Sequence, residues 1–192
     1  MPTQDKDISK SLARGQTRYA HHVAGIHQQM GIPENYARTH KLMLQQECKR
    51  PVCIGHDLFD REQFLLPQAA QAWQEMQSSA KTAGIDLRVV SAFRSVEYQA
   101  GIINRKLDAG QSIDEILKVS AAPGYSEHHT GRALDISTPG YKPLEQEFEN
   151  SSAFDWLQNS ASGFGFSMSY PKNNIHDIAY EPWHWCFSDT ML

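Results

Sequence analysis

Three side chains in the middle and near the end of the chain have the types and spacing that bind a divalent zinc ion. The sequence SEHHTGRALD at 126–135 supplies His128 and Asp135, and the sequence EPWH at 181–184 supplies His184. Two imidazoles and one carboxylate leave a fourth position of a tetrahedral ion open, which is typical of catalytic zinc rather than structural zinc. Glu181 is a further carboxylate that could act as a base on an attacking water. Together these residues predict a zinc hydrolase.

The spacing of the first motif indicates which elements hold its residues. His128 and Asp135 are seven positions apart, so on one regular strand their side chains would point to opposite faces. Gly131 interrupts the pattern between them, and residues 132–137 then alternate polar and apolar as a half-buried strand does. We therefore expect His128 on a loop and Asp135 on a strand, where the small Ala133 shares its face and leaves room for an ion.

The second motif follows the same logic. Glu181 and His184 would point to opposite faces of a regular strand, but Pro182 cannot donate to a central ladder and marks a strand start or an edge. We therefore expect Glu181 just outside a strand that carries His184. For either motif alone, a loop histidine or strand carboxylate that merely caps or pairs with a neighbour is an equally good interpretation. Both motifs in this order favour the metal site.

The remaining cysteines and histidines do not supply a competing metal site. Cys48 and Cys53 have no matching second pair and Cys186 stands alone, so no structural zinc cluster is predicted. His129 adjoins a predicted ligand, but neighbours on an extended chain diverge. We expect it at the rim of the cleft or as a donor that supports the ligands. Surface or capping roles are the default for the other histidines.

Both motifs resemble those of the VanY-like D-alanyl-D-alanine and L,D-carboxypeptidases, zinc peptidases that trim bacterial cell-wall peptides. The family pattern S-x-H-x-x-G-x-A-x-D is filled from Ser126 to Asp135, and E-x-W-H is filled at 181–184. A third element, an aromatic-Arg-Ser run, is matched at 93–95, where tyrosine is common in place of Phe93. The resemblance covers about residues 60 to 188 and leaves the first 55 residues outside it.

The resemblance implies a role for each candidate residue. The implied Zn2+ ligands are His128, Asp135 and His184. Glu181 would take a proton from the attacking water and pass it to the leaving amine. Arg94 would clamp the C-terminal carboxylate of the substrate, because a guanidinium offers two parallel donors to a planar carboxylate. Ser126 would add a hydroxyl donor to that carboxylate or orient the His128 loop, with a simple turn residue as the alternative.

The implied substrate is the stem peptide of peptidoglycan, from which such an enzyme removes a terminal D-alanine. We prefer L,D-carboxypeptidase activity, which trims a recycled tetrapeptide to the tripeptide, because a cytoplasmic D,D-enzyme would attack the precursors of wall synthesis. A D,D-carboxypeptidase or D-Ala-D-Ala dipeptidase is the close alternative. A wall endopeptidase is less favoured because Arg94 would clamp a free chain end. A non-catalytic wall-peptide-binding or metal-binding module is less favoured because Glu181 is retained.

Composition sets limits on partners and location. The 192 residues are 40% hydrophobic, which is enough for one core. A formal net charge of -4 and the lack of a basic run make a nucleic-acid partner unexpected. No segment approaches the roughly 18 apolar residues that span a bilayer, and residues 1–10 lack the apolar core of a secretory signal. We expect a cytoplasmic protein, or an exported one if a signal has been removed; the oligomeric state is left open.

The hydrophobic pattern predicts the elements that must position these residues. We expect residues 1–55 to form an N-terminal helical extension, with a helix over 36–50, and residues 56–192 to form the carboxypeptidase domain, with a loop over 48–60. The other expected elements are helices over about 66–83, 96–107 and 112–119, a strand over 85–91, a helix capped by Ser151 or Ser152, and two or three short late strands. Helices early and strands late indicate an α+β fold with a small, mostly antiparallel sheet flanked by helices.

The tryptophans divide between the core and the cleft in this interpretation. The expected core members are Trp73, Trp156 and Trp183. We expect Trp185 to line the cleft beside His184.

Overall fold

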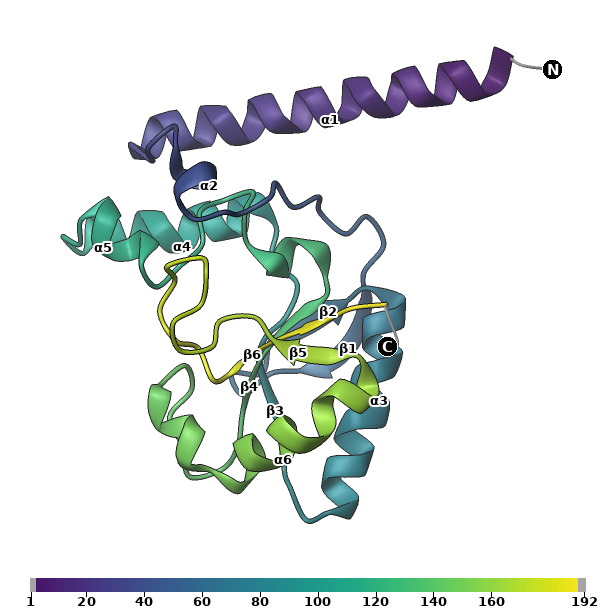
Figure 1. The fold of residues 1–192 in the computed structure, drawn as a ribbon, viewed down its shortest axis with the longest axis vertical. Helices are drawn as coiled ribbons and strands as arrows, with labels where there is room; N and C mark the ends of the chain where they lie inside the picture. The colour runs from purple at the N-terminus through teal and green to yellow at the C-terminus, as the bar shows by residue number, and fades with distance from the viewer. Residues whose placement is uncertain (1–2, 190–192) are drawn as a thin grey trace.

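A small antiparallel sheet lies at the centre of the molecule (Figure 1). The structure is a computed structural model that describes residues 3–189. The sheet has the strand order β3-β4-β6-β5, and its strands are β3 (Arg88–Ser91), β4 (Ala133–Ser137), β6 (His184–Phe187) and β5 (Phe166–Met168). A separate antiparallel hairpin is formed by β1 (Val52–His56) and β2 (Glu62–Leu65). The predicted α+β class with a small antiparallel sheet is confirmed.

One face of the sheet packs on the hydrophobic core. The helix α3 (Pro67–Thr82) contributes Trp73 and Met76 to this core, and α6 (Ser152–Ser160) contributes Leu157. From the sheet, Leu134 and Ile136 are fully buried in the same cluster. Because side chains alternate along a strand, Ala133, Asp135 and Ser137 of β4 point to the opposite face. That opposite face is where the functional side chains gather.

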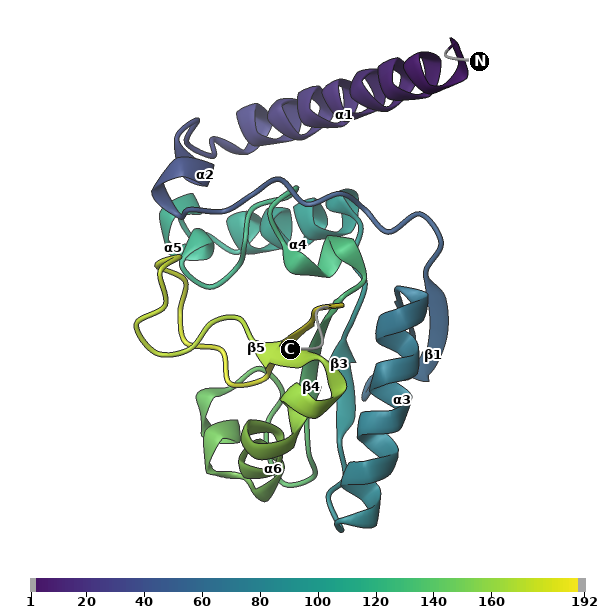
Figure 2. The same ribbon diagram turned by 45° about the vertical axis from the view of Figure 1, so that its right-hand side comes forward.

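Two helices lie at one end of the sheet, and both follow the sequence predictions (Figures 1 and 2). The helix α4 (Val96–Asp108) begins at Ser95, whose hydroxyl accepts the N–H of Tyr98. The short helix α5 (Ile113–Leu117) lies within the predicted helix over 112–119 and opens with a capping box between Ser112 and Glu115. Ser151, the predicted cap of α6, accepts the N–H of Phe154. The remaining elements are the 3-10 turns η1 (Glu127–Thr130), η2 (Gln146–Asn150) and η3 (Ala161–Phe164).

The N-terminal part of the chain differs from prediction in two places. The expected helix over 36–50 is wrong, because α2 (Tyr36–Thr39) is a single turn and the chain then extends. The expected loop over 48–60 is wrong, because β1 lies within it. The extended segment is held by tertiary hydrogen bonds, from Gln45 N to Gly124 O and from Cys48 N to His129 O, each 2.8 Å. Such pairing overrides a local helical preference.

The long helix α1 (Thr3–Met30) lies on the far side of α4 from the sheet (Figures 1 and 2). Its C-terminal half contacts the rest of the chain. Tyr19 donates to the backbone oxygen of Gln45 at 2.6 Å, and His27 Nε2 lies 2.7 Å from the carbonyl oxygen of Pro123. The predicted boundary between residues 55 and 56 falls within β1. No helix in the described range 3–189 is long and apolar enough to cross a membrane.

Gly131 ends the η1 turn in a left-handed conformation with φ of 67°. A Cβ at this position would lie 2.8 Å from the backbone nitrogen of Leu66 and 3.2 Å from Cβ of Cys48. The Gly131 carbonyl also accepts the Leu66 N–H at 2.8 Å. Only glycine satisfies both the backbone angle and this close approach.

We therefore predict that Gly131→Ala destabilises the protein more than a change of backbone angle alone explains. Gly140→Ala is the matched control, because Gly140 also has positive φ (89°) but open space where a Cβ would stand. The control should cost about 1–2 kcal/mol of unfolding free energy for the left-handed residue, and Gly131→Ala about 1–3 kcal/mol more from the clash. Chemical denaturation measures both, and equal losses would contradict the packing role of Gly131.

Candidate active site

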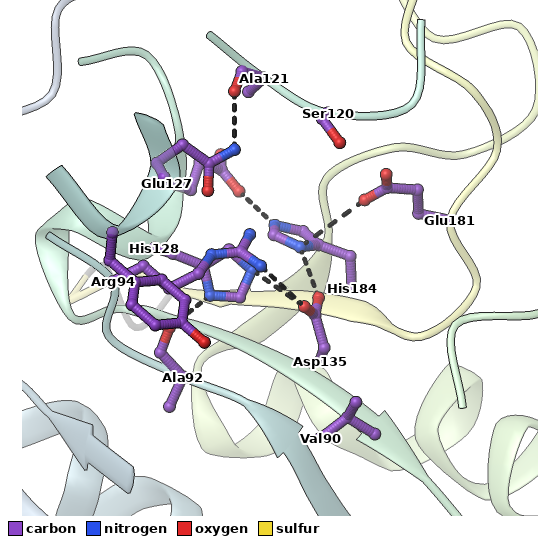
Figure 3. Close-up of polar contacts among 12 residues, drawn as sticks. Val90, Ala92, Arg94, Ser120, Ala121, Glu127, His128, Asp135, Glu181 and His184 are labelled. Atoms are coloured by element: carbon purple, nitrogen blue, oxygen red, sulfur yellow. Dashed lines mark hydrogen bonds and ion pairs between the residues drawn. The ribbon is translucent and has the colours of Figure 1, made fainter. Parts of the chain in front are cut away.

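Strand pairing brings two of the three predicted metal ligands together. In the β4–β6 register, Asp135 is the direct partner of His184. Directly opposed residues on antiparallel strands point to the same face, with Cβ atoms about 4.5–5.5 Å apart. His184 Nδ1 lies 3.0 Å from Asp135 Oδ1, and both side chains are buried (Figure 3). The sheet itself therefore fixes the distance between an imidazole and a carboxylate.

The η1 turn brings the third predicted ligand to the same point. His128 is buried, and its Nδ1 contacts the carbonyl oxygen of Ala92, just beyond β3 (Figure 3). A carbonyl can only accept, so Nδ1 carries the proton and Nε2 has a free lone pair. That Nε2 lies 3.2 Å from Asp135 Oδ2. It is buried, and no hydrogen bond to it is formed by any residue in the described part of the chain.

These three side chains fit a metal ion. One ligand atom from each of His128, Asp135 and His184 lies within 4.8 Å of the other two. Ligands of a tetrahedral zinc at about 2.0–2.2 Å are about 3.3–3.6 Å apart, close to the 3.0 and 3.2 Å separations between the aspartate oxygens and the two imidazoles. A buried imidazole nitrogen with a free lone pair and no hydrogen-bond donor, as at His128 Nε2, is suited to coordinate a Lewis acid. The cluster could therefore bind a metal.

Electrostatics in the cluster favour a cation. Burial opposes protonation of His184, but contacts with Asp135 and Glu127 outweigh it and raise the pKa of His184 to about 10. Burial, together with the nearby Arg94, lowers the pKa of His128 to about 4. Despite burial, the two histidines hold the pKa of Asp135 well below its usual range. Protonated His184 thus balances the buried Asp135 and the half-buried Glu127, a role that a divalent ion would take over.

Glu127 supports His184 and was missed in the sequence. Its Oε2 lies 2.9 Å from His184 Nε2 and accepts a hydrogen bond from the Ser169 hydroxyl at 2.6 Å (Figure 3). Burial would raise the pKa of Glu127, but the contact with His184 outweighs it and lowers the pKa to about 2. With Nε2–H donated to this carboxylate, Nδ1 of His184 is the nitrogen that faces Asp135. A metal-ligating histidine usually donates its second ring N–H to an acceptor. The sequence could therefore have been searched for a carboxylate in this role.

Glu181 lies in the turn just before β6, outside the strand as expected. Its Oε2 is 3.8 Å from His184 Nδ1, the nitrogen that faces Asp135 (Figure 3). Burial is the largest influence on Glu181 and raises its pKa to about 7. A carboxylate with this pKa can both accept and return a proton near neutral pH.

Arg94 is fixed by its backbone and leaves guanidinium donors for a ligand. Its N–H donates to the carbonyl of His128 at 3.2 Å, and its carbonyl accepts from His129 Nδ1 at 2.7 Å. Nη1 lies 3.8 Å from Asp135 Oδ2. Nε is buried, and no described residue accepts a hydrogen bond from it. A buried guanidinium donor without an acceptor at a cleft wall is suited to an anionic ligand.

His129 has a structural position rather than the expected place at the cleft rim. It is fully buried. Its Nδ1 donates to the carbonyl of Arg94, while Nε2 accepts the N–H of Gly124 at 3.0 Å. The two adjacent histidines in η1 therefore have different contacts. His128 points to the candidate metal cluster, whereas His129 links the backbone of Arg94 to that of Gly124 by hydrogen bonds. The expectation that His129 lies at the cleft rim is wrong. His129 supports the backbone of Arg94 and does not support the proposed metal ligands.

All six predicted site residues line one cleft of about 590 Å³. Ser126 is buried in its wall, and its side chain does not cap η1. Gln99 of α4 lines the same wall, donates to the Ala121 carbonyl at 2.8 Å, and leaves its Oε1 buried without a partner among residues 3–189. Gln99 was not singled out from the sequence, although a polar residue on the buried face of a helix is a usable signal.

The expectation for Trp183 holds in part, and the expectation for Trp185 is wrong. Trp183 packs against the hydrophobic core, as expected, but it also lines the cleft. Trp185 is 3% exposed in the hydrophobic core, and its indole donates to the Pro182 carbonyl. Trp185 and His184 are adjacent on β6, so they face opposite sides of the sheet. Tyr170, also missed, lines the cleft with its ring 4.9 Å from that of His184.

An α+β fold that gathers two histidines, an aspartate and a separate, partly buried glutamate in one cleft has the layout of a metal-dependent hydrolase. The chain belongs to the VanY family of D-alanyl-D-alanine carboxypeptidases, whose sequence profile matches residues 62–190. The family and the fold expected from the two motifs are confirmed.

Individual relatives agree with this assignment. YodJ of Bacillus subtilis (strain 168) is 31% identical over 166 residues, which cover 84% of this chain and 58% of YodJ. VanXYC of Enterococcus gallinarum, a bifunctional D-Ala-D-Ala dipeptidase and D-Ala-D-Ala carboxypeptidase, is 29% identical over 157 residues, which cover 77% of this chain and 78% of VanXYC. The solved structure of the LdcB LD-carboxypeptidase is similar with a TM-score of 0.66 at 31% identity, over 76% of this chain and 71% of that one.

We predict that Glu127→Ala weakens zinc binding by about 10–100-fold, because His184 loses the acceptor that orients it. Glu127→Gln should lose less, since the amide oxygen can still accept the His184 Nε2–H. Glu149→Ala is the control, because Glu149 pairs with Lys172 outside the cleft. Competition with a chelating dye measures the affinities. Unchanged binding by Glu127→Ala would show that His184 needs no support from this carboxylate.

Proposed function

We propose that this chain is a zinc-dependent carboxypeptidase that removes the C-terminal D-alanine from peptidoglycan peptides. The observation that carries the proposal is the presence in one cleft of the metal-ligand cluster, the partly buried Glu181 and the Arg94 guanidinium, whose Nε has no acceptor among the described residues. The first two are the parts needed to hydrolyse an amide, and the third is the part needed to recognise a free chain end.

In this proposal the metal is held by His128 Nε2, Asp135 and His184 Nδ1. When bound, zinc supplies Lewis-acid polarisation of the peptide carbonyl and acidifies water. Glu181 accepts a proton from the attacking water and delivers it to the departing amine of D-alanine. Its raised pKa suits both transfers. Glu127 keeps His184 in the orientation that presents Nδ1.

In this proposal Arg94 sets the orientation of the substrate. Arg94 would bind the terminal carboxylate through its free donors, with the Ser126 hydroxyl as a second donor from the same wall. An endopeptidase has no use for a buried cation at this point, because its substrate continues past the scissile bond without a carboxylate. The clamp therefore supports an exopeptidase.

For the bond that is cleaved, we propose an L,D linkage, as in the trimming of a tetrapeptide to a tripeptide. The likeness to the LdcB LD-carboxypeptidase over most of this chain supports this choice. The three cysteines, Cys48, Cys53 and Cys186, are all free, which suits a reducing cytoplasmic compartment where D,D cleavage of wall precursors would be harmful. The likeness to VanXYC keeps D,D cleavage as the second candidate. We further propose residues 56–192 as the catalytic domain and residues 1–55 as its extension.

Muropeptide digestion tests the proposal. The zinc-loaded protein is incubated separately with a tetrapeptide and a pentapeptide, and the products are identified by mass spectrometry. Release of free D-alanine from the tetrapeptide is the expected result. Release from the pentapeptide alone would establish the D,D candidate, and an internal fragment would point to an endopeptidase.

Substitutions at the cluster separate binding from chemistry. We predict that His128→Ala, Asp135→Ala and His184→Ala each lower zinc occupancy and abolish hydrolysis. Glu181→Gln should retain zinc while turnover falls by at least ~10²-fold, because an amide cannot accept the water proton. Metal analysis and single-turnover kinetics measure the two effects. Loss of zinc from Glu181→Gln would make Glu181 a ligand and reverse its assigned role.

Arg94 should control recognition of the chain end. We predict that Arg94→Ala lowers kcat/KM by roughly 10²-fold, in line with about 2–3 kcal/mol for a hydrogen-bonded charged partner. Arg94→Lys should recover only part of the loss, since it lacks the bidentate geometry. Amidation of the substrate's C-terminus should cause a similar loss with the unmodified enzyme and little further loss with Arg94→Ala, because both changes remove one contact. Additive losses would place the carboxylate elsewhere.

A further inference from the structure

A second cation lines the cleft and has no role in the scheme above. Lys106 lies on the face of α4 that carries Gln99 and Ile102, and all three side chains border the cleft. The spacing of three and seven positions places them along one side of the helix. Lys106 is half-buried, whereas most of the described lysines are exposed to water. It is therefore part of the wall rather than a solvated surface charge.

The ammonium group of Lys106 has unused donors. Nζ donates to the Ser120 hydroxyl at 2.8 Å. An ammonium has three donors, and only one is used by this contact. Of the lysines whose side chains the structure describes, Lys172 alone lies within 4.0 Å of a carboxylate, that of Glu149. Glu181 attracts the Lys106 ammonium electrostatically but forms no ion pair with it. A half-buried ammonium that lines a cleft and is not ion-paired is matched to an anionic group of the ligand.

The position of this group differs from that of the chain-end clamp. Arg94 precedes α4, whereas Lys106 lies in its last turn. At 1.5 Å per residue the helix separates its first residue from Lys106 by about 15 Å. In the view of Figure 3, Arg94 lies to the left of the His184 ring, whereas Ser120 lies above it. A peptide whose terminal carboxylate is held by Arg94 would thus meet Lys106 and Ser120 through a different residue.

We infer that Lys106 and Ser120 form a second anion subsite, which binds a side-chain carboxylate on the residue that precedes the terminal D-alanine. This inference rests on the proposed function and narrows its substrate class. A third stem-peptide residue that is a diamino-dicarboxylic acid carries this group. Such a residue carries the carboxylate beside a side-chain ammonium, whereas lysine at the same place carries only the ammonium, which the Lys106 charge repels. Lys106 is then a specificity-determining residue that sorts peptides by charge.

Three tetrapeptides that differ only in the third residue test the subsite. That residue is meso-diaminopimelate, the same residue with its side-chain carboxylate amidated, or L-lysine. The zinc-loaded enzyme should favour the free carboxylate over its amide by about 10-fold in kcat/KM, mostly through KM, as expected for one charged contact. Lys106→Gln should reduce this preference to within about 2-fold, and Lys106→Glu should favour the lysine peptide.

Ser120→Ala and a matched lysine control complete the design. Ser120→Ala should lose part of the preference, because Lys106 loses the hydroxyl that holds it. Lys118→Gln should behave as the unmodified enzyme, since Lys118 is exposed and lies outside the cleft. Equal cleavage of the three peptides by the unmodified enzyme would overturn the inference. A preference that survives in Lys106→Gln would do the same.

Calorimetric measurement of tripeptide binding tests the subsite independently of hydrolysis, and therefore independently of the proposed function. The affinities of the free and amidated tripeptides for the zinc-loaded protein are compared with those for Lys106→Gln. A preference for the free carboxylate that Lys106→Gln removes supports the subsite, even if no peptide releases D-alanine and the proposed function fails. No difference between the two tripeptides overturns the subsite whether or not hydrolysis occurs.

Discussion

The antiparallel register between β4 and β6 is the constraint on which the site depends. It pairs Asp135 with His184 on the cleft face and Leu134 with Trp185 on the core face. A slip of one residue would exchange the two faces and bury the ligands in the apolar core. The large apolar area of Trp185 makes that exchange costly. The candidate metal site and the hydrophobic core therefore lie on the two faces of one strand pairing, and the core residue Trp185 directly follows the proposed ligand His184.

A second constraint fixes the η1 turn against the end of β3. The backbone N–H of Arg94 donates to the His128 carbonyl, and its backbone carbonyl accepts a hydrogen bond from the His129 side chain. Cys48 of the extended N-terminal segment donates its N–H to the His129 carbonyl in this turn, and Gln45 donates to the carbonyl of Gly124 just before the turn. Arg94 and His128, the proposed clamp and third ligand, are thus positioned by the same few hydrogen bonds. Residues that precede the family-matched region form part of this support.

The residues proposed as ligands, base and clamp could be singled out from the sequence, and they line one cleft, because metal chemistry restricts residue type and spacing. The capped helices could be predicted because their signals are local. The segment after Thr39 could not, since its conformation is set by hydrogen bonds to residues far along the chain. The roles of Glu127 and His129 also depend on tertiary contacts, because each acts through the orientation of a neighbour. The wrong expectation for Trp185 could have been avoided from the sequence, because adjacent residues on a strand point to opposite faces and Trp185 directly follows His184.

The central claim is that one strand register and one turn converge on a metal ion through two imidazoles and one carboxylate. X-ray absorption spectroscopy of the zinc-loaded protein tests it most directly, with the Glu181→Gln protein measured alongside. The account predicts a low-coordinate zinc with only nitrogen and oxygen ligands at about 2.0–2.1 Å, two of them imidazoles, and the same spectrum in the variant. A sulfur ligand at about 2.3 Å, or loss of one ligand in Glu181→Gln, would contradict it.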